Sequence, residues 1–336
     1  MRKGYNPNKD KENIKLDYYH QVIIPVYIPT NLDYFTDSLK ILKLTVKSLL
    51  KTSHKKTFIT IINNGSSKEV RTYLESLLES NKIHELIHTV NIGKLNAILK
   101  GLSGSNFPLI SISDADVFFL NNWQKETYTV FETFPKTGFV NPCPSSKVLK
   151  RFTYNVIFDN LFSSNLKFTS VKNPNALKRF AESIGNPSFY NQYHLEQYLT
   201  ISNKEKYAVI GGGHFVGTYR GEVFNSINQK YTEFSLGGTS ENDILDAPVV
   251  DNGFWRLSTQ DNYAYHMGNS YETWMDTIEL NEIEFNIERP VLKEIKNSKI
   301  SNKIKSTFFS LFLSRKGIWN KFLTYKGLNK KGVKNY

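Results

Sequence analysis

The first third of the chain alternates short apolar runs with stretches of helical periodicity, and this order constrains the fold more than any other feature of the sequence. The apolar runs, rich in β-branched residues, are 21–29, 57–66, 86–90 and 108–113. Leu and Val recur at helical spacing in the stretches between them, 33–51, 67–79 and 95–102. Buried strands separated by helices predict an α/β fold with a doubly wound, mainly parallel sheet.

Beyond residue 120 the periodicity is weaker. Residues 145–205 are rich in Asn, Ser, Phe and Tyr, and we interpret them as an inserted subdomain with helices near 176–183 and 192–199. A strand over 207–213 and a helix near 221–228 are expected to follow. We expect these elements to complete the domain around the parallel sheet.

Basic residues are concentrated at the C-terminal end. The formal net charge is +12, and residues 293–336 alone contain twelve Lys or Arg and one acid, Glu294. The rest of the chain is close to neutral, so no nucleic-acid partner is expected on the folded body. Nucleic-acid binding through this tail is kept as an alternative.

Cysteine content and hydropathy indicate a reducing compartment. Cys143 is the one cysteine of the chain, which excludes an internal disulfide and a cysteine-rich zinc site. The polar residues 1–20 lack the apolar core of a signal peptide, and we interpret them as a flexible lead-in. The apolar stretch 308–313 (FFSLFL) is too short to span a bilayer. We therefore expect a cytoplasmic protein.

Two aspartates follow the apolar run 108–113. In SISDADVFF (111–119), Asp114 and Asp116 are two residues apart, so in an extended chain both carboxylates point to the same side. Neighbouring anions repel each other, and a hard divalent cation such as Mg²⁺ or Mn²⁺ relieves the repulsion because it takes oxygen ligands. A solvated turn after the strand is the alternative interpretation.

A glycine and a lysine precede the helix predicted over 95–102. Helix N-termini and the lysine ammonium group both attract phosphate, so Lys94 is a candidate for binding a diphosphate. The segment lies one strand before the two aspartates, and strands of such a sheet present their ligand-binding residues at one edge. A plain helix start with a solvent-exposed Lys94 is the alternative.

Four motifs of the first 120 residues, taken in their order along the chain, resemble the nucleotide-binding half of glycosyltransferase family 2 proteins. These proteins have the GT-A fold, a Rossmann-like α/β fold. The matching segments are IIPVY (23–27), IINNGS (61–66), NIGK (91–94) with Ala97 and Gly101, and DAD (114–116). The resemblance implies that the residues around Pro25, Tyr27 and Asn63 hold the base and ribose of a nucleotide-sugar. It also implies that Asp114 reaches the ribose or the metal, and that Asp116 binds the metal.

Two positions depart from the family pattern. Asn63-Asn64 replaces the usual Asp-Asp or Asp-Asn, and Leu99 replaces an Asn. The amide oxygen of Asn63 still accepts a hydrogen bond, so uracil binding survives the change and a UDP-sugar is the expected donor. Lys94 and a bound Mn²⁺ or Mg²⁺ are expected to stabilise the charge on the departing diphosphate.

The second half resembles the family through two segments. Residues 211–227 (GGGHFVGTYRGEVFNSI) are similar to an acceptor-side segment with a glycine-rich turn, and TSENDIL (239–245) follows where the family places its acidic catalytic motif. Glu241, or failing it Asp243, is then the base that deprotonates the acceptor hydroxyl in an inverting transfer. A capping box formed by Ser240 and Asp243 would explain the same spacing.

A late histidine completes the predicted metal site. His266, in NYAYHMGN (262–269), resembles the metal-binding His of several GT-A enzymes. The predicted metal ligands are therefore Asp114, Asp116 and His266, although a lone His is more often structural. His214 is placed on the acceptor side instead.

These assignments divide the chain into four parts. They are a lead-in (1–20), a nucleotide-sugar-binding half (21–120), an acceptor-binding and catalytic half (121–292) and a basic helical tail (293–336). The tail mixes bases with aromatic residues, which suits an anionic membrane surface, so we expect a peripheral contact. A solvated basic extension, or packing of a tail helix on the body, is the rival interpretation.

The expected function is transfer of a sugar from a nucleotide-sugar to a saccharide or glycoconjugate acceptor, in the synthesis of a cell-surface polysaccharide. A nucleotidyltransferase also combines an α/β fold with metal-binding carboxylates, and it is the alternative among enzymes. An inactive scaffold of the same fold is a third possibility, against which the presence of both Asp114 and Asp116 counts.

Overall fold

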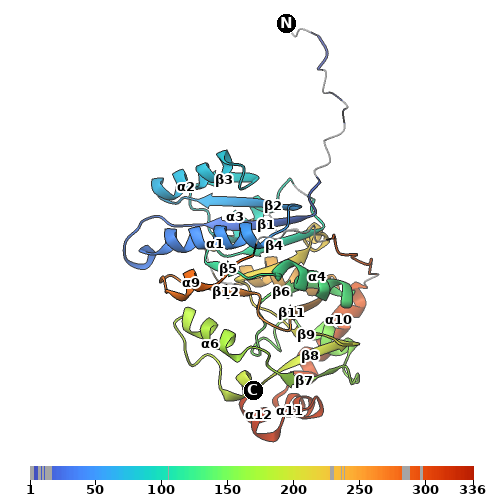
Figure 1. Ribbon diagram of the computed structural model, residues 1–336. Coiled ribbons are helices and arrows are strands. Elements are labelled where there is room, and N and C mark those ends of the chain that lie inside the picture. The colour runs from blue at the N-terminus through green and yellow to red at the C-terminus, as the bar shows by residue number, and fades with distance from the viewer. Residues whose placement is uncertain are drawn as a thin grey trace.

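The centre of the molecule is a ten-stranded sheet in the order β3-β2-β1-β4-β10-β6-β11-β9-β8-β7 (Figure 1). The computed structural model describes residues 4–6, 9, 11, 17–104, 106–227, 231–235, 237, 239–281, 288–295 and 298–336. The strands of this sheet are β1 (His20–Val26), β2 (Thr57–Asn64), β3 (Glu85–Thr89), β4 (Leu109–Ser113), β6 (Thr137–Asn141), β7 (Leu166–Ser170), β8 (Gln197–Asn203), β9 (Lys206–Ile210), β10 (Val216–Arg220) and β11 (Trp255–Thr259). A separate two-stranded sheet pairs β5 (Val117–Phe119) with β12 (Ala264–His266).

Helices connect these strands and cover the sheet. The α-helices before the tail are α1 (Ser38–Thr52), α2 (Lys68–Glu79), α3 (Lys94–Leu102), α4 (Trp123–Thr133), α5 (Tyr154–Asp159), α6 (Pro174–Ser183), α7 (Gln192–Glu196), α8 (Ala247–Asp251) and α9 (Trp274–Thr277). The 3₁₀ segments are η1 (Asp33–Phe35) and η2 (Gly221–Ser226), and η3 (Asn242–Asp246) is π-helical. The tail contains α10 (Lys299–Phe308), the π-helical η4 (Phe309–Leu313), α11 (Lys316–Tyr325) and α12 (Lys330–Asn335).

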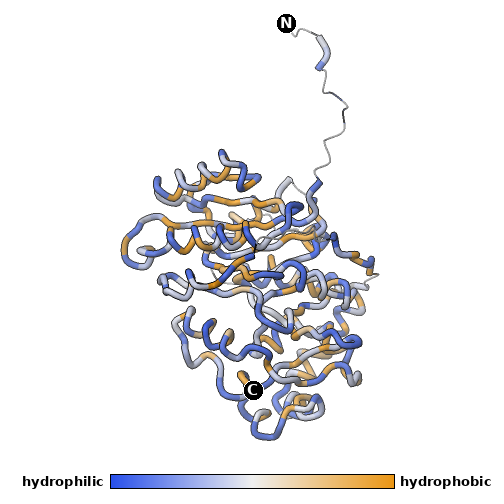
Figure 2. The backbone as a smooth tube through the Cα atoms, viewed as in Figure 1, coloured by the Kyte–Doolittle hydropathy of each residue, from blue (hydrophilic) through white to orange (hydrophobic). Residues whose placement is uncertain are grey.

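Alternate residues of β1 face two different helical layers. Val22 and Ile24 pack in one core with α1 and α2, whereas Ile23 packs in another core with α3. Because both faces of the strand are covered, its residues form a continuous apolar run instead of alternating with polar ones. In Figure 2, hydrophobic segments gather along the inner strands. The predicted doubly wound α/β architecture is confirmed.

The parallel part of the sheet lies in the first half of the chain. Strands β3, β2, β1 and β4 are parallel neighbours, and their bounds agree with the predicted runs to within two residues at most ends. Beyond β4 the sheet is mixed: β10 pairs antiparallel with β4 and β6, β11 runs parallel to β6, and β9, β8 and β7 add antiparallel pairs. One sheet therefore joins the two predicted halves.

Some predicted elements of the second half differ from the structure. The helix expected over 192–199 ends at Glu196, and residues from Gln197 onward form β8, because this alternating segment pairs with β7 and β9. The subdomain expected over 145–205 contributes β7 and β8 to the main sheet. The helix expected over 221–228 is the 3₁₀ segment η2, and residue 228 lies outside the described residues.

The two ends of the chain also refine the predicted division. Most of the lead-in 1–20 lies outside the described residues, but Tyr18 packs edge-on against Phe58 and His84, so the body begins before residue 20. At the other end, η4 and α11 pack in a core with β7 and β8, whereas α10 packs against α5 and α8. Figure 1 shows α11 close to β7. Within the described ranges, no helix has both the length and the apolar content required to cross a bilayer.

Candidate functional site

The carboxyl ends of β1, β2 and β4 meet at a cavity of about 410 Å³. Five of the residues predicted to bind the nucleotide or the metal line this cavity. They are Pro25, Tyr27, Lys94, Asp114 and Asp116. Parallel strands bring their carboxyl ends to one edge of a sheet, so residues about 90 positions apart in the sequence converge here.

Asn63 is the exception among the predicted nucleotide-binding residues. Its side chain is buried beside the cavity lining, where Oδ1 accepts the Ser66 N–H at 3.0 Å and Nδ2 lies 3.0 Å from His88 Nδ1. The neighbouring Asn64 lines the cavity instead, and its Oδ1 accepts the backbone N–H of Ile92 at 2.9 Å. Asn64, and not Asn63, therefore lines the cavity, because the β2 pleat turns Asn64 toward it.

The loop before α3 brings Lys94 to the cavity. Gly93, at the N-cap of α3, has φ +86°, a backbone conformation that favours glycine, and a Cβ there would lie 2.8 Å from Ser235 Cα. Lys94 is the first residue of the helix, and its N–H donates to the Ser235 carbonyl at 2.9 Å. The N-terminal end of α3 and one lysine thus lie together at the cavity, as the sequence predicted.

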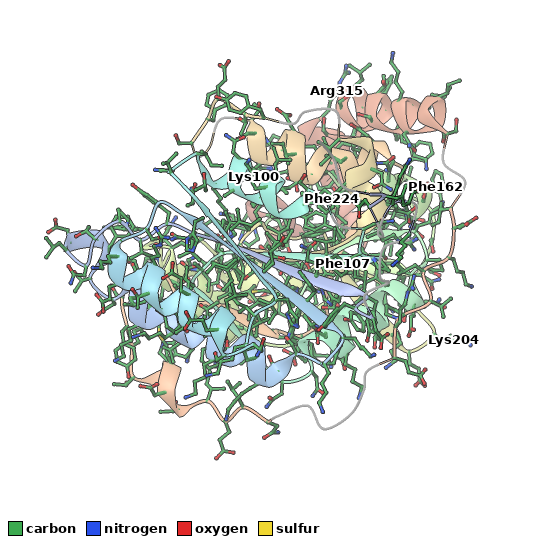
Figure 3. The ribbon with its side chains drawn as sticks, turned by 90° about the horizontal axis from the view of Figure 1, so that it is seen from above. Lys100, Phe107, Phe162, Lys204, Phe224 and Arg315 are labelled. Carbon is green, nitrogen blue, oxygen red and sulfur yellow. The ribbon has the colours of Figure 1, made fainter. Side chains whose placement is uncertain are left out.

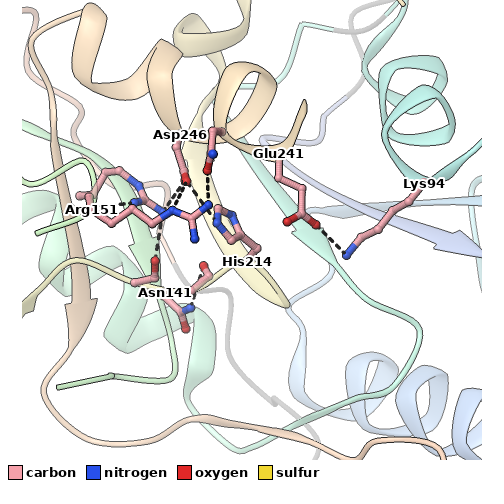
Figure 4. A network of polar contacts seen from close by, with 10 residues as sticks. Lys94, Asn141, Arg151, His214, Glu241 and Asp246 are labelled. Atoms are coloured by element: carbon pink, nitrogen blue, oxygen red, sulfur yellow. Dashed lines mark hydrogen bonds and ion pairs between the residues drawn. The ribbon is translucent and has the colours of Figure 1, made fainter. Parts of the chain in front are cut away.

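Lys94 lies between two carboxylates. Its Nζ is 2.5 Å from Asp114 Oδ1. It is also 3.8 Å from Glu241 Oε1 (Figure 4). Burial alone would lower the pKa of Lys94, but the charge of Asp114, followed by those of Glu241 and Asp116, holds it above its ordinary value. A fully charged ammonium group is therefore available beside the cavity.

The two-stranded sheet carries His266 to Asp116. β12 pairs antiparallel with β5, with His266 opposite Val117, and the Met267 N–H donates to the Asp116 carbonyl at 2.8 Å. This pairing places His266 Nε2 at 3.4 Å from Asp116 Oδ2. Asp114 does not share this contact, because residues 114–116 form a turn between β4 and β5 and not an extended strand.

Ser183 on α6 determines which nitrogen of His266 faces Asp116. Its Oγ is 2.8 Å from the Phe180 carbonyl oxygen and 2.9 Å from His266 Nδ1. A carbonyl oxygen can only accept, so the hydroxyl proton points to Phe180 and Oγ accepts the Nδ1–H of His266. In the neutral ring, Nε2 then directs a lone pair at the Asp116 carboxylate, and a cation or a proton between the two acceptors stabilises this arrangement.

This pair fits a divalent metal ion. Asp116 Oδ1 is buried and has no hydrogen-bond partner among the described residues, and burial, opposed by His266, raises the pKa of Asp116 to about 6. In the described part of the chain, no group of three or more His, Cys, Asp or Glu is arranged to hold a metal. Asp116 and His266 would then supply two ligands, which suits Mg²⁺ or Mn²⁺ because these ions also coordinate substrate phosphates and water.

The two predicted bases, Glu241 and Asp243, have different surroundings in the segment that leads into η3. Glu241 is partly buried and lies beside Lys94, whereas Asp243 is exposed, and its Oδ2 accepts the Thr239 hydroxyl at 2.7 Å. A capping box of Ser240 and Asp243 was the alternative to a catalytic role. Asp243 does make a local bond of this kind at the helix start, but its partner is Thr239 and not Ser240. Glu241 is the acid that this segment presents to the lysine.

Comparison with known proteins assigns the chain to a family. The family model described as glycosyl transferase family 2 matches residues 22–198, more than half of the 336 residues. The chain belongs to glycosyl transferase family 2. With its sheet topology, this family 2 chain has the predicted α/β GT-A fold. No curated protein matches the chain.

Three solved structures are similar to this family 2 chain over 74% of its length. A mannosyltransferase from Pyrobaculum calidifontis, PcManGT, in complex with GDP-Man and Mn²⁺, is 13% identical with a TM-score of 0.40. GalNAc-T7 with UDP, GalNAc and Mn²⁺ is 12% identical with a TM-score of 0.47, and S. aureus TarS 1-349 with UDP is 11% identical with a TM-score of 0.42. The alignments cover 58%, 44% and 60% of those chains, less than two thirds of each.

One group beside the site of this family 2 chain was missed at the sequence level. Asp246, at the end of η3, is fully buried and lies 2.6 Å from Arg256 Nη2 and 3.1 Å from His214 Nε2 (Figure 4). The sequence signal was a single acid inside the apolar stretch ILDAPVV (244–250), which requires a buried partner. The ion pair ties η3 to β11 and thereby fixes the segment that carries Glu241.

Proposed function

We propose that this family 2 chain transfers a sugar from a nucleotide diphosphate sugar, a UDP-sugar by its resemblance, to a saccharide or glycoconjugate acceptor with inversion at the anomeric carbon. The observation that carries the proposal is the cavity where a charged lysine and the Asp116–His266 pair lie at the ends of β1, β2 and β4. A lysine and a metal-binding pair at one cavity suit a diphosphate, whose oxygens bind both.

The lining of the cavity suggests where the donor lies. Pro25, Tyr27 and Asn64 form the side nearest β1 and β2, which would hold the base and ribose. Lys94 and the start of α3 would bind the diphosphate, and Asp116 and His266 would hold a divalent metal. The metal, when bound, would stabilise negative charge on the departing diphosphate.

Glu241 is the proposed general base. In an inverting transfer, the acceptor oxygen forms a bond to the anomeric carbon while the bond from that carbon to the diphosphate oxygen breaks. The acceptor proton passes to a carboxylate of Glu241, and the nucleoside diphosphate leaves with the bonding electron pair. The position of Glu241, 3.8 Å from Lys94 Nζ, supports a base close to the reacting end of the donor.

We further propose that the acceptor belongs to a cell-surface polysaccharide or glycoconjugate that is extended on the cytoplasmic side of the membrane. Resemblance to the family is the support for this role. The Asp246–His214 contact supports an acceptor-side place for His214, because the ring lies beside the segment that carries Glu241.

The direct test is to incubate the purified chain with Mn²⁺ and a panel of UDP- and GDP-sugars, with saccharide acceptors, and to analyse the products. The proposal predicts metal-dependent release of nucleoside diphosphate and a glycosylated acceptor without a nucleotide. A product sugar that retains its nucleotide would identify a nucleotidyltransferase instead. Inactivity with every donor, together with absence of nucleotide binding, would favour an inactive scaffold.

A further inference from the structure

The C-terminal helices contain two sets of apolar side chains with different surroundings. One set is buried in a core shared with β7, β8, α4 and α5. It consists of Phe309, Leu313, Trp319, Phe322, Leu323 and Leu328. These side chains fix the tail on the body, so the rival interpretation from the sequence, packing of the tail on the body, is correct for this set.

The second set faces away from the body. Ile300, Ile304, Leu311, Phe312 and Ile318 are between 42% and 74% exposed. Ile300, Ile304 and Leu311 are four and seven residues apart, so they lie on one face of the continuous helix formed by α10 and η4. Single exposed apolar residues are normal on protein surfaces, but several on one helical face mark an interaction surface.

The charged residues around these exposed apolar side chains are all basic. Lys303, Arg315, Lys316 and Lys321 are exposed, and none of them has an acidic partner within the described residues. Glu294 is the last acidic residue of the chain. By contrast, Lys305 and Lys326 are engaged with the body: Lys305 Nζ is 2.6 Å from Asp159 Oδ1, and Lys326 Nζ donates to the carbonyl oxygens of Asn160 and Ser163.

We propose that the outer face of α10, η4 and the start of α11 docks on an anionic lipid bilayer. In this arrangement Ile304, Leu311 and Phe312 insert below the headgroups, while Lys303 and Arg315 contact lipid phosphates. Figure 3 shows Arg315 at the outer edge of the molecule, beside the C-terminal helices. Figure 1 shows α11 at the end of the sheet opposite β3 and α10 along the side of the molecule.

Two other occupants fit the surface less well. A second copy of the chain in a two-fold interface would bring the same surface against itself, and the bases would repel each other. A nucleic acid would satisfy the bases, but it would leave the isoleucine and leucine side chains in contact with a polar phosphate backbone. The bilayer is the partner that satisfies both kinds of side chain.

The test uses the full chain and vesicles of phosphatidylcholine with and without phosphatidylglycerol, and measures the bound fraction by sedimentation. The variants are Ile304→Ser with Leu311→Ser, and Lys303→Gln with Arg315→Gln. The matched control is Leu78→Ser, an exposed apolar position on α2. Point variants are preferable to truncation after Leu292, because truncation would expose the buried set to which the tail contributes. Circular dichroism verifies that each variant is folded.

The proposal predicts that the parent binds the anionic vesicles, that both double variants bind at least about tenfold more weakly, and that Leu78→Ser binds like the parent. Equal binding of the parent to neutral vesicles, or no binding to either kind, would overturn the proposal. So would a serine double variant that binds like the parent. Conversion of a parent dimer to a monomer by the serine variant, seen by light scattering, would identify a contact between copies instead.

Discussion

The hydroxyl group of Ser183 orients the ring of His266, one of the two proposed metal ligands. It accepts the His266 Nδ1–H and so keeps Nε2 available to a metal. We expect Ser183→Ala to weaken Mn²⁺ binding about 10- to 100-fold, because the ring loses the partner that fixes its tautomer and orientation. Titration calorimetry with Mn²⁺ measures this effect without any turnover.

Two further variants separate this role from a general effect on helix stability. Ser183→Thr keeps the hydroxyl and should retain most of the affinity. Ser76→Ala removes a serine on α2 that makes the same type of bond, to the Tyr73 carbonyl at 2.7 Å, without contact to the site. Equal losses of Mn²⁺ affinity in Ser183→Ala and Ser76→Ala would contradict the assignment.

Glu241 and Asp243 differ in what their removal should change. We expect Glu241→Gln to reduce the transfer rate about 100- to 10,000-fold while UDP affinity stays within a few-fold, since a base contacts the acceptor and not the donor. Asp243→Asn should transfer sugar near the parental rate, because that carboxylate is exposed and accepts the Thr239 hydroxyl. Rates and UDP titrations on both variants check this contrast, and the reverse ranking of the two rates would reassign the base.

The sequence predicted which segments reach the cavity, but it did not predict every side chain that lines it. Lys94, Asp114 and Asp116 end predicted strands or begin a predicted helix, so their convergence followed from the topology. The choice between Asn63 and Asn64 depends on the phase of the β2 pleat, which a run of apolar residues buried on both faces does not reveal. His266 reaches Asp116 through two three-residue strands, which are too short to leave a periodic signal.

A chain of buried hydrogen bonds joins several elements across the first half of the sheet. The Lys56 N–H donates to His54 Nδ1 at 3.1 Å, so the neutral ring carries its proton on Nε2, 2.8 Å from the Tyr128 hydroxyl. Tyr128 in turn lies 2.6 Å from His20 Nδ1, and His20 Nε2 lies 2.7 Å from Ser111 Oγ. β1, β4 and α4 are therefore connected by two imidazoles that are neutral in the folded state.

These histidines predict that stability falls in mild acid. Burial lowers the pKa of His54 from 6.5 to about 4, and burial followed by the charge of His54 lowers that of His20 well below its ordinary value. Between about pH 4 and 6.5 the unfolded chain binds more protons than the folded chain, so stability is full above pH 6.5 and declines as the pH falls. For His54 alone, this difference in pKa corresponds to a loss of about 3 kcal/mol in the free energy of unfolding as the pH falls from 6.5 to 4.

Urea denaturation at a series of pH values measures this slope. His54→Gln replaces the titrating ring by an amide, so we expect it to be less stable at pH 7 but to show a smaller decline in acid. A free energy of unfolding that stays constant for the parent from pH 7 to pH 5 would contradict the neutral network. The variant should leave metal binding unchanged, because His54 does not line the cavity.

Element prediction succeeded where periodicity extends over several turns or a whole buried strand. The helices α1, α2 and α3 and the strands β1, β2 and β4 were predicted close to their observed bounds. The strands β6, β10 and β11 were not predicted, because polar residues or glycine interrupt their apolar runs (TGFVN, VGTYR and WRLST) and their pairing partners lie far away in the sequence. For β8, pairing on both sides overrides the helical tendency of the residues that precede it.

At the scale of the whole molecule, the tail is part of the folded core. Trp319 is 4% exposed and packs against the rings of Phe309 and Phe322. We expect Trp319→Ala to lower the free energy of unfolding by about 3–5 kcal/mol, as for other buried aromatic side chains. Ile318→Ala, the exposed neighbour on the same helix, should change it by less than about 0.5 kcal/mol. Chemical denaturation compares the two, and equal effects would show that α11 is not docked as described.

The central claim is that the cavity at the ends of β1, β2 and β4 binds a nucleoside diphosphate through Lys94 and a metal held by Asp116 and His266. Calorimetric titration with UDP or GDP, with and without Mn²⁺, tests it most directly when the parent is compared with Asp116→Asn. We predict Mn²⁺-dependent binding to the parent and loss of that dependence in the folded variant. Equal affinity of parent and variant in the presence of Mn²⁺ would contradict the claim.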